Sequence, residues 1–425
     1  MGARPRPIQL LLLIWSLIRV TGEAGAGTAP ALPQEAYVWQ RAWTPAVVAA
    51  VRECGPELAS LVPLAAEVAW RHGEMSVVRV PLDFAALKAT GRSVGLALRI
   101  GPHAGPFHAD DALGIKLGEL AATLLAAARA GGLEPRELQI DFDCATAHLA
   151  GYQTWVTAWR ARIAPTPLVI TALPSWLEQP GMAGLAGAVD GWILQVHSLE
   201  RPKSAAAPFT LCDPAAARRA VAAASRLGRP FRVALPTYGY AVAFDARGEF
   251  FGLAAEGPAR DWPAGAQVKE VRSRPEELAE LVRAWTASPP PNLRGLIWYR
   301  LPNAEDGRNW NWPTLRAVMA GRAPREQWRA EGRTPEPGLT EIWLHNDGET
   351  GAGPRPRLRV SWTGARMLAA DGLAGYAAEP GGPNSLLLTF PPAPSERTPA
   401  PGAAQMAGWL RFNVNPPITL ELLPQ

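Results

Sequence analysis

The stretch Leu138-Gln139-Ile140-Asp141-Phe142-Asp143 is an apolar segment that ends in two carboxylates placed two residues apart. Such a segment is typical of a β-strand, in which side chains at positions i and i+2 point to the same side. Asp141 and Asp143 are therefore expected to share one face. Two acids at the C-terminal end of a strand that is followed by a helix indicate the functional face of a (β/α)8 barrel.

Apolar runs on both sides of this strand alternate with helical segments. Thr44 before Pro45 is a helix start signal, and Gly131-Gly132 ends the helix predicted over 112–130. Ser273-Arg274-Pro275-Glu276 is a capping-box pattern that predicts another helix start. Eight strands are predicted to begin near residues 37, 61, 94, 138, 168, 191, 231 and 295. Continuous apolar strands that alternate with helices indicate a parallel sheet covered on both faces, and eight such units favour a closed barrel.

The first residues predict a secretory signal peptide over residues 1–26. Arg4 and Arg6 precede an apolar run from Ile8 to Val20, and small residues follow it. The run is short for a membrane span, which needs about 20 apolar residues. We therefore expect export across the inner membrane to the periplasm, with no integral membrane span in the mature protein.

The character of the sequence changes after residue 321. Residues 322–340 are rich in Pro, Gly, Arg and Glu and are predicted to form a linker. Short apolar runs separated by Pro/Gly turns follow over residues 341–425, which indicates a small all-β, sandwich-like domain. The expected organisation is an α/β (β/α)8 TIM-type barrel over residues 34–321 followed by this C-terminal domain.

The composition argues against several classes of function. The 425 residues carry a formal net charge of +4, and the basic residues are scattered, so nucleic-acid binding is not predicted. Cys54, Cys144 and Cys212 match no zinc-site spacing and are expected to be buried, although one disulfide among them stays possible. No metal and no other cofactor is predicted.

Five segments of the predicted barrel carry landmark motifs in a fixed order. They are LQIDFD (138–143), LVITALPSWL (168–177), VDGWILQVHS (189–198), VALPTYGY (233–240) and GLIWYRLP (295–302). Together they resemble the bacterial family called domain of unknown function 3142, over most of residues 36–325. They are also similar to strands four to eight of glycoside hydrolase family 18, whose fourth strand ends in D-x-x-D-x-D-x-E. In that resemblance Asp141 and Asp143 match the two inner aspartates, and Trp298 matches the tryptophan that floors the sugar pocket. The resemblance implies a barrel that acts on, or binds, a glycan.

The departure from the family 18 pattern concerns the catalytic acid. Ala145 occupies the position of the family's catalytic acid, and Leu138 occupies the position of the first aspartate of the pattern. Gln195-Val196-His197 stands where the family has a tyrosine and a carboxylate. Because alanine cannot protonate a leaving group, hydrolysis by the family's own mechanism is not expected.

Three functions therefore stay open. In the first function, Asp141 and Asp143 are the acid and base of a glycoside hydrolase, because two close carboxylates push their pKa values apart. A carboxylate such as Glu67, Asp245, Glu249 or Asp306 would replace one of them in a variant of this hypothesis. The second is a non-catalytic carbohydrate-binding barrel, a relic of a glycosidase, and the third is an envelope scaffold protein with unknown protein partners.

Around the catalytic candidates Asp141 and Asp143, a set of polar and aromatic residues is predicted to line the substrate site because each lies at or near the end of a strand. The set comprises Arg99, His197, Tyr238, Trp298, Trp176, Gln195 and Trp39. A purely structural role for the two aspartates is the alternative, in which they form an ion pair with Arg99 of the neighbouring strand.

Overall fold

The stretch around Asp141 forms strand β6 (Leu138–Phe142) of a closed parallel barrel. The computed structural model describes residue 2 and residues 32–71, 74–108, 110–198, 201–255, 262–351, 355–390 and 398–423. Eight parallel strands follow one another in the order β1-β13-β9-β8-β7-β6-β5-β2, and pairing of β1 with β2 closes the ring. The other seven strands are β1 (Gln34–Val38), β2 (Ser60–Arg71), β5 (Leu96–Ile100), β7 (Leu168–Ala172), β8 (Gly191–Gln195), β9 (Phe231–Pro236) and β13 (Leu293–Tyr299). The predicted (β/α)8 architecture is confirmed.

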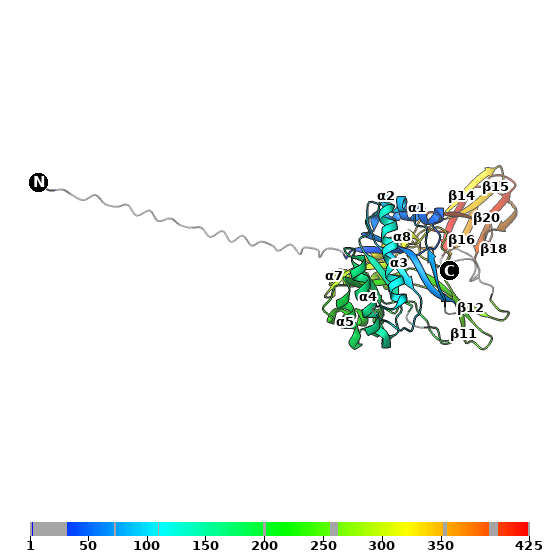
Figure 1. Cartoon of the computed structure of the whole chain (residues 1–425). Helices are drawn as coiled ribbons and strands as arrows, with labels where there is room; N and C mark the ends of the chain where they lie inside the picture. Colours follow the sequence, from blue (N-terminus) through cyan, green and yellow to red (C-terminus); the bar gives the residue numbers. More distant parts are fainter. Residues whose placement is uncertain are drawn as a thin grey trace. The chain divides into compact units, whose positions relative to one another are not determined.

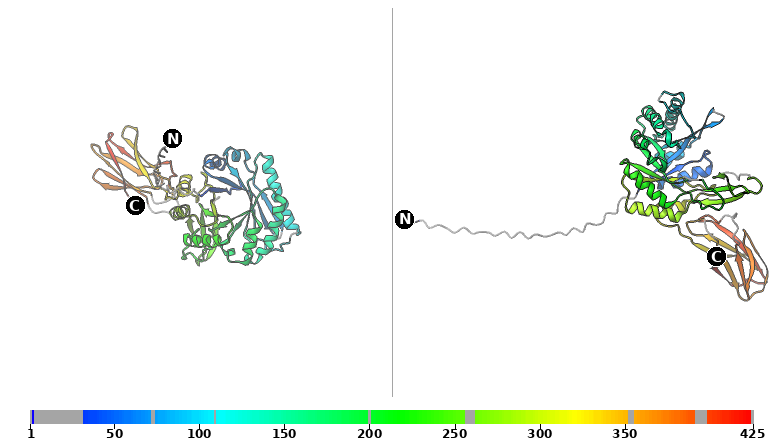
Figure 2. Two further views of the ribbon diagram at one scale, coloured as in Figure 1. Left: turned by 90° about the vertical axis from the view of Figure 1, so that its left-hand side faces the viewer. Right: turned by 90° about the horizontal axis from the view of Figure 1, so that it is seen from below.

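Helices cover the outside of the barrel, as Figures 1 and 2 show. They are α1 (Pro45–Cys54), α2 (Phe84–Ala89), α3 (Ala112–Ala130), α4 (Leu149–Ile163), α5 (Pro180–Ala188), α6 (Pro214–Arg226), α7 (Pro275–Ala287) and α8 (Trp312–Met319). Short 3-10 turns lie at η1 (Gly55–Glu57), η2 (Thr146–His148) and η3 (Pro174–Trp176). Thr44 caps α1 as predicted, since its side chain accepts a hydrogen bond from the backbone N–H of Val47.

The predicted capping box at the start of α7 is wrong. Arg274 is the N-cap residue, and its side chain makes no capping hydrogen bond. The Ser273 hydroxyl instead donates to the backbone carbonyl of Tyr238 at 2.8 Å, inside the protein. The serine therefore anchors the loop after β9 rather than the first turn of the helix.

Each barrel strand has one face toward the barrel axis and one toward the helices. The residues packed inside are Tyr37, Val62, Ala97, Val169, Ile193, Ala234 and Ile297, with Trp39 and Tyr299 beside them. The larger hydrophobic core lies between the strands and the helices and contains Trp155, Trp176, Trp192 and Trp298. This division decides which strand-end residues can reach the mouth of the barrel.

A layer of charged residues lies near the N-terminal ends of the strands. The Arg232 guanidinium binds Glu35 and, at 2.7 Å, Glu137, and all three side chains are buried. Arg136 adds a second contact to Glu35 at 2.9 Å. Because each buried carboxylate has an arginine partner, the barrel floor is close to neutral.

Two antiparallel extensions leave the C-terminal ends of barrel strands. β2 continues past the ring and pairs with β3 (Glu74–Arg79), while β4 (Ser93–Val94) adds a short parallel pairing at its other end. After β9, the chain forms a three-stranded sheet of β10 (Gly239–Phe244), β11 (Phe250–Ala254) and β12 (Gln267–Arg272), which the sequence analysis did not predict.

The C-terminal domain is made of two four-stranded antiparallel sheets, with orders β14-β15-β20-β17 and β18-β19-β16-β21. Its strands are β14 (Trp328–Glu336), β15 (Leu339–Asn346), β16 (Arg357–Trp362), β17 (Met367–Gly372), β18 (Ala377–Gly382), β19 (Ser385–Thr389), β20 (Ala404–Phe412) and β21 (Ile418–Leu423). A separate hydrophobic core joins residues of both sheets, including Leu344 and Leu358. This arrangement agrees with the predicted sandwich.

The predicted linker over residues 322–340 needs a correction. Residues 328–336 form β14, which pairs with β15 at one edge of its sheet. The strand is mostly exposed and contains Gly332 and Pro335, so it lacks the apolar alternation that identifies a half-buried strand. The β-domain therefore begins about a dozen residues before the predicted boundary at 341.

Other predictions concern the ends of the chain and the cysteines. The predicted signal peptide lies, apart from Gly2, outside the described residues. Among the described helices, none is long and apolar enough to cross a membrane. The cysteines at 54, 144 and 212 are free and buried, as the preferred interpretation expected.

Candidate functional site

Asp141 lies at the end of β6 on the face that points into the barrel. Gln139, two residues earlier, accepts a 2.7 Å hydrogen bond from the Tyr37 hydroxyl inside the ring, and this fixes the inward face of the strand. Asp143 follows on the same side, one residue beyond the strand. The two predicted catalytic carboxylates thus meet at the C-terminal mouth of the barrel.

Arg99 of the neighbouring strand β5 joins the two carboxylates. Its Nη1 lies 2.6 Å from Oδ2 of Asp141, and its Nη2 lies 2.8 Å from Oδ2 of Asp143. The contact follows from the strand register, in which Arg99 is directly beside Asp141. The Thr171 hydroxyl of β7 donates to the other oxygen of Asp141 at 2.8 Å. The predicted ion pair is confirmed, and it includes both aspartates.

The two carboxylates differ in their access to solvent. The side chain of Asp141 is 9% exposed, whereas that of Asp143 is 39% exposed. Burial raises the pKa of Asp141 above its ordinary value, although the Arg99 guanidinium acts in the opposite direction. Asp141 is thus the enclosed member of the pair, and Asp143 is the one that a ligand at the mouth can reach.

His197 and Tyr238 form a second polar group, beyond the ends of β8 and β9. Nδ1 of His197 lies 3.1 Å from the Tyr238 hydroxyl, and the imidazole stacks on the ring of Tyr299 with 5.5 Å between centroids. The Gln195 side chain donates to the backbone carbonyl of His197 at 3.2 Å. Burial lowers the pKa of His197 to about 3, so its imidazole is neutral.

This buried histidine predicts a pH dependence of stability. His197 has a lower pKa in the folded protein than the ordinary value of about 6.5 in the unfolded chain, so the unfolded state binds more protons below that pH. Stability contributed by the neutral imidazole is therefore complete above about pH 6.5 and is lost as the pH falls. Between pH 7 and pH 5 we expect the loss to be roughly 2 kcal/mol larger in the wild type than in His197→Gln. Urea unfolding at both pH values measures this difference, and equal losses in the two proteins would contradict it.

An aromatic wall stands beside these polar groups. Tyr299, at the end of β13, has its ring centroid 5.2 Å from that of Trp39 and 5.4 Å from that of Tyr238. Trp39 follows β1, as predicted for a residue at a strand end, and Trp39 and Tyr299 are both half-buried. Aromatic rings of this kind stack against the apolar faces of sugars, while neighbouring polar groups fix the orientation.

A family model matches residues 108–304, within which Asp141, Asp143, His197 and Tyr238 lie, and its description is domain of unknown function (DUF3142). The matched region covers somewhat less than half of the chain. Arg99 and Trp39 precede the matched region, so the site described here draws on residues from outside it as well. A comparison with curated proteins gave no match.

Solved structures that are similar to this chain include two spore cortex-lytic enzymes and a chitinase. The spore cortex-lytic enzyme SleL from Bacillus cereus has 16% identity and a TM-score of 0.46 over 70% of this chain and 75% of that one. A chitinase from Chromobacterium violaceum has 14% identity and a TM-score of 0.47 over 68% and 99%. SleL from Bacillus megaterium has 12% identity and a TM-score of 0.49 over 70% and 75%. Similarity at this level carries no statement about chemistry, which has to come from the side chains of this chain.

Two of the tryptophans that were predicted to line the substrate site lie elsewhere. Trp298 is fully buried between the barrel and its helices, where its indole N–H donates to the Gln34 side chain at 2.8 Å and its ring packs against Trp310. Trp176 is 1% exposed and packs against Tyr152 in the same core. Neither ring reaches the barrel mouth, because each belongs to the face of the chain that packs against the helices.

Tyr299 and Thr171 are the site residues that sequence reasoning missed. Ile297 packs inside the barrel, so Tyr299, two residues later, also points inward, whereas Trp298 points outward. Such an alternation is visible in strand β6, where Gln139, Asp141 and Asp143 are polar and alternate with apolar residues. No such alternation marks β13, whose residues are buried on both faces.

The other carboxylates that the sequence offered as catalytic partners lie in separate ion pairs or turns. Ala145, at the family's acid position, is exposed and begins the turn η2. Glu67 pairs with Arg41 at 2.6 Å, and Asp306 pairs with Arg300 at 2.5 Å. Asp245 and Glu249 lie in the turn between β10 and β11, where Asp245 accepts hydrogen bonds from backbone N–H groups. Within the described ranges, no group of three or more His, Cys, Asp or Glu side chains is arranged to hold a metal ion.

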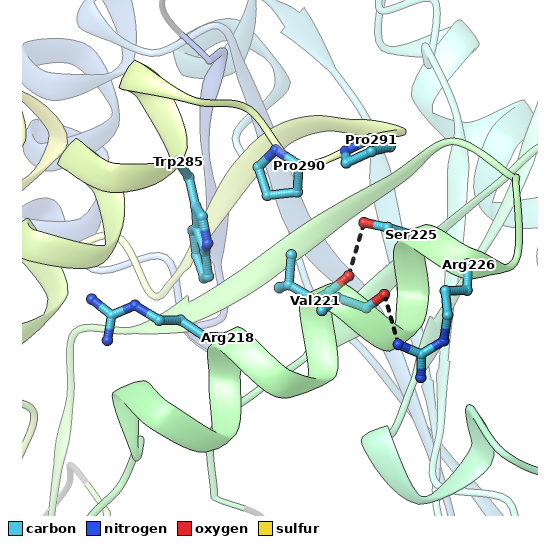
Figure 3. A pocket seen from close by; sticks show the side chains of 8 residues that line it. Arg218, Val221, Ser225, Arg226, Trp285, Pro290 and Pro291 are labelled. Atoms are coloured by element: carbon cyan, nitrogen blue, oxygen red, sulfur yellow. Dashed lines mark hydrogen bonds between the residues drawn. The ribbon is translucent and has the colours of Figure 1, made fainter.

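A groove of about 390 Å³ on the outside of the barrel lies away from this site. Figure 3 shows its lining, formed by α6, by Trp285 of α7 and by the prolines before β13. Arg218, Arg226 and Ser225 are the polar residues in this lining, and Ser225 and Arg226 bond to carbonyls of their own helix. The groove contains no carboxylate or imidazole, so the barrel mouth remains the candidate functional site.

Proposed function

We propose that the mouth of the barrel binds a glycan without hydrolysing it by chitinase-type acid catalysis. The observation that carries the proposal is the guanidinium of Arg99, which binds Asp141 and Asp143 at once. It leaves the two carboxylates fixed as recognition groups at the same barrel mouth as the aromatic wall of Trp39 and Tyr299. Polar groups that fix orientation next to rings that stack on sugars are the usual elements of a carbohydrate site.

Acid catalysis requires a carboxylic acid that is protonated and in contact with the leaving oxygen. Burial raises the pKa of Asp141, but its two oxygens are occupied by Arg99 and Thr171. Asp143 is exposed, and its Oδ2 is bound to the Arg99 guanidinium at 2.8 Å. The enclosed carboxylate therefore cannot reach a substrate, and the accessible one is held against a guanidinium rather than against a leaving group.

Hydrolysis through Asp143 as a base or nucleophile is the second candidate function. It is favoured by the 39% exposure of this side chain and by Oδ1, which has no hydrogen-bond partner among the described residues. A retaining or inverting glycosidase needs a second carboxyl group within about 5–10 Å to act as the acid. This candidate therefore requires Asp141 to lose its contact with Arg99 when substrate binds.

One experiment separates the two functions. Purified protein is mixed with a panel of bacterial envelope and exopolysaccharide glycans, and binding and reducing-end release are measured together. Binding without release by the wild type, weakened in the Asp141→Asn/Asp143→Asn variant, is the result that the proposal expects for at least one glycan. Release by the wild type that is absent from the variant would overturn it in favour of hydrolysis.

Tyr299→Ala should weaken binding of that glycan by about 1–3 kcal/mol, because the variant removes one ring of the aromatic wall. Trp298→Phe on the same strand is the matched control, since Trp298 is buried away from the mouth. Isothermal titration calorimetry of both variants measures the effect. If only Trp298→Phe weakened binding, the aromatic wall would not be part of the site.

The predicted signal peptide supports a periplasmic location for this binding function. We propose that residues 1–26 are removed on export and that the barrel meets its glycan outside the inner membrane. Fractionation of cells, together with the mass of the purified mature protein, tests this. An intact N-terminus in the cytoplasmic fraction would contradict it.

A further inference from the structure

The charges at the strand ends of the mouth do not balance. Arg41 pairs with Glu67, and Arg300 pairs with Asp306, so each of these pairs is neutral. Arg99 faces two carboxylates rather than one. The cluster of Arg99, Asp141 and Asp143 therefore carries one net negative charge when both aspartates are ionised.

The excess charge is located on Asp143. Asp141 is enclosed, and hydrogen bonds from Arg99 and Thr171 occupy both of its oxygens. Asp143 uses Oδ2 for Arg99, and its Oδ1 has no partner among the residues that the structure describes. A carboxylate oxygen at the mouth is thus available to a ligand.

The remaining polar groups of the mouth add no positive charge. Burial lowers the pKa of His197 to about 3, which keeps the imidazole neutral. Burial raises the pKa of Tyr299 above its ordinary value, and the negative charge of Asp141 acts in the same direction. Gln195, Thr171 and Tyr238 are neutral side chains. No cation among these groups offsets the charge on Asp143.

We propose that the ligand of the mouth is a glycan with free amino groups, in which the ammonium of a de-N-acetylated hexosamine pairs with Asp143. This inference rests on the proposed glycan-binding function and adds the chemical class of the sugar. An ammonium group supplies the missing positive charge and donates to the open oxygen of Asp143. The ring of the same sugar stacks on the aromatic wall, whose π faces also attract cations.

Acidic glycans and N-acetylated glycans fit the barrel mouth less well. A uronic acid would bring a second negative charge to Asp143, which is repulsive at short range. An N-acetylated hexosamine keeps the ring that stacks but replaces the ammonium by a neutral amide. The charge on the amino group is therefore the feature that distinguishes preferred from weak ligands.

The test compares two oligosaccharides with the same backbone, a glucosamine hexamer and an N-acetylglucosamine hexamer. Calorimetric titration of the full-length protein at pH 6 should show at least tenfold tighter binding of the glucosamine hexamer. Asp143→Asn should reduce this ratio to about one, while Asp143→Glu should retain most of it. Asp190→Asn is the matched control, because Asp190 also pairs with an arginine, Arg160, but at the opposite end of the barrel.

The outcomes separate the inference from the function on which it rests. Equal binding of both hexamers, or tighter binding of the N-acetylated one, would overturn the inference and leave glycan binding standing. A preference that survives unchanged in Asp143→Asn would overturn the role of this residue. Failure of the folded protein to bind any glycan of the panel would overturn the proposed function itself.

Discussion

Replacing Arg232 by methionine should lower the free energy of unfolding by about 3–5 kcal/mol. The guanidinium lies among Glu35 and Glu137 in the charged layer near the barrel floor, where all three side chains are buried. The variant leaves two buried carboxylates with Arg136 as their remaining arginine partner. An uncompensated charge in such a place is costly because few water molecules can solvate it. Urea unfolding, followed by far-UV circular dichroism, measures the loss.

Two further variants serve as controls for this prediction. Arg160→Met removes an arginine from the more exposed ion pair with Asp190 and should cost less than about 1 kcal/mol. Combining Arg232→Met with Glu35→Gln and Glu137→Gln should recover part of the stability, since positions 35 and 137 then carry no negative charge. A loss below about 1 kcal/mol for Arg232→Met alone would show that the layer is not a closed ion cluster.

Replacing Arg99 by methionine should cost about 3 kcal/mol at pH 7, because Asp141 would lose its cation inside the barrel while Asp143 stays beside it. The pKa of Asp141 is already raised by burial, and removal of Arg99 raises it further. A carboxyl with a higher pKa in the folded state binds more protons there than in the unfolded chain. Stability of the variant is therefore lost as the pH rises and is regained as the pH falls.

The measurement is the difference in unfolding free energy between wild type and Arg99→Met at pH 7 and at pH 5. This difference should shrink on acidification, because Asp141 of the variant takes up a proton that the wild type binds less readily. His197 is present in both proteins, so its own pH dependence cancels in the comparison. A difference that grows at pH 5 would contradict the assignment of Asp141 as the buried partner of Arg99.

Much of the barrel was predictable because its strands and helices differ in simple patterns. The strand at 138–142 alternates apolar and polar residues, and the helix predicted over 112–130 has these same bounds in the structure. The carboxylates of β6 were predictable for the same reason, since polar residues on alternate positions of an otherwise apolar strand define an inward face. The ion pair with Arg99 follows from the order of neighbouring strands.

Other parts depend on contacts that a single sequence does not contain. In Leu296-Ile297-Trp298-Tyr299 every residue is apolar or aromatic, so the pattern does not tell which ones face the barrel axis. The register of β13 with β1 and β9 decides it. Ser273 has the spacing of a capping residue, but its partner is a carbonyl that is distant in sequence, at Tyr238. Tertiary contacts override local preference at both places.

The proline of β14 has a counterpart at the other sheet of the C-terminal domain. Pro335 lies in β14 and Pro380 in β18, and each of these strands is at the edge of its sheet. An outer strand normally offers a row of free backbone donors to any extended chain that approaches it, and proline interrupts that row. Charged side chains on β14, including Arg333 and Glu331, add a desolvation penalty to such pairing. The edges formed by β14 and β18 are thereby less open to pairing with another extended chain.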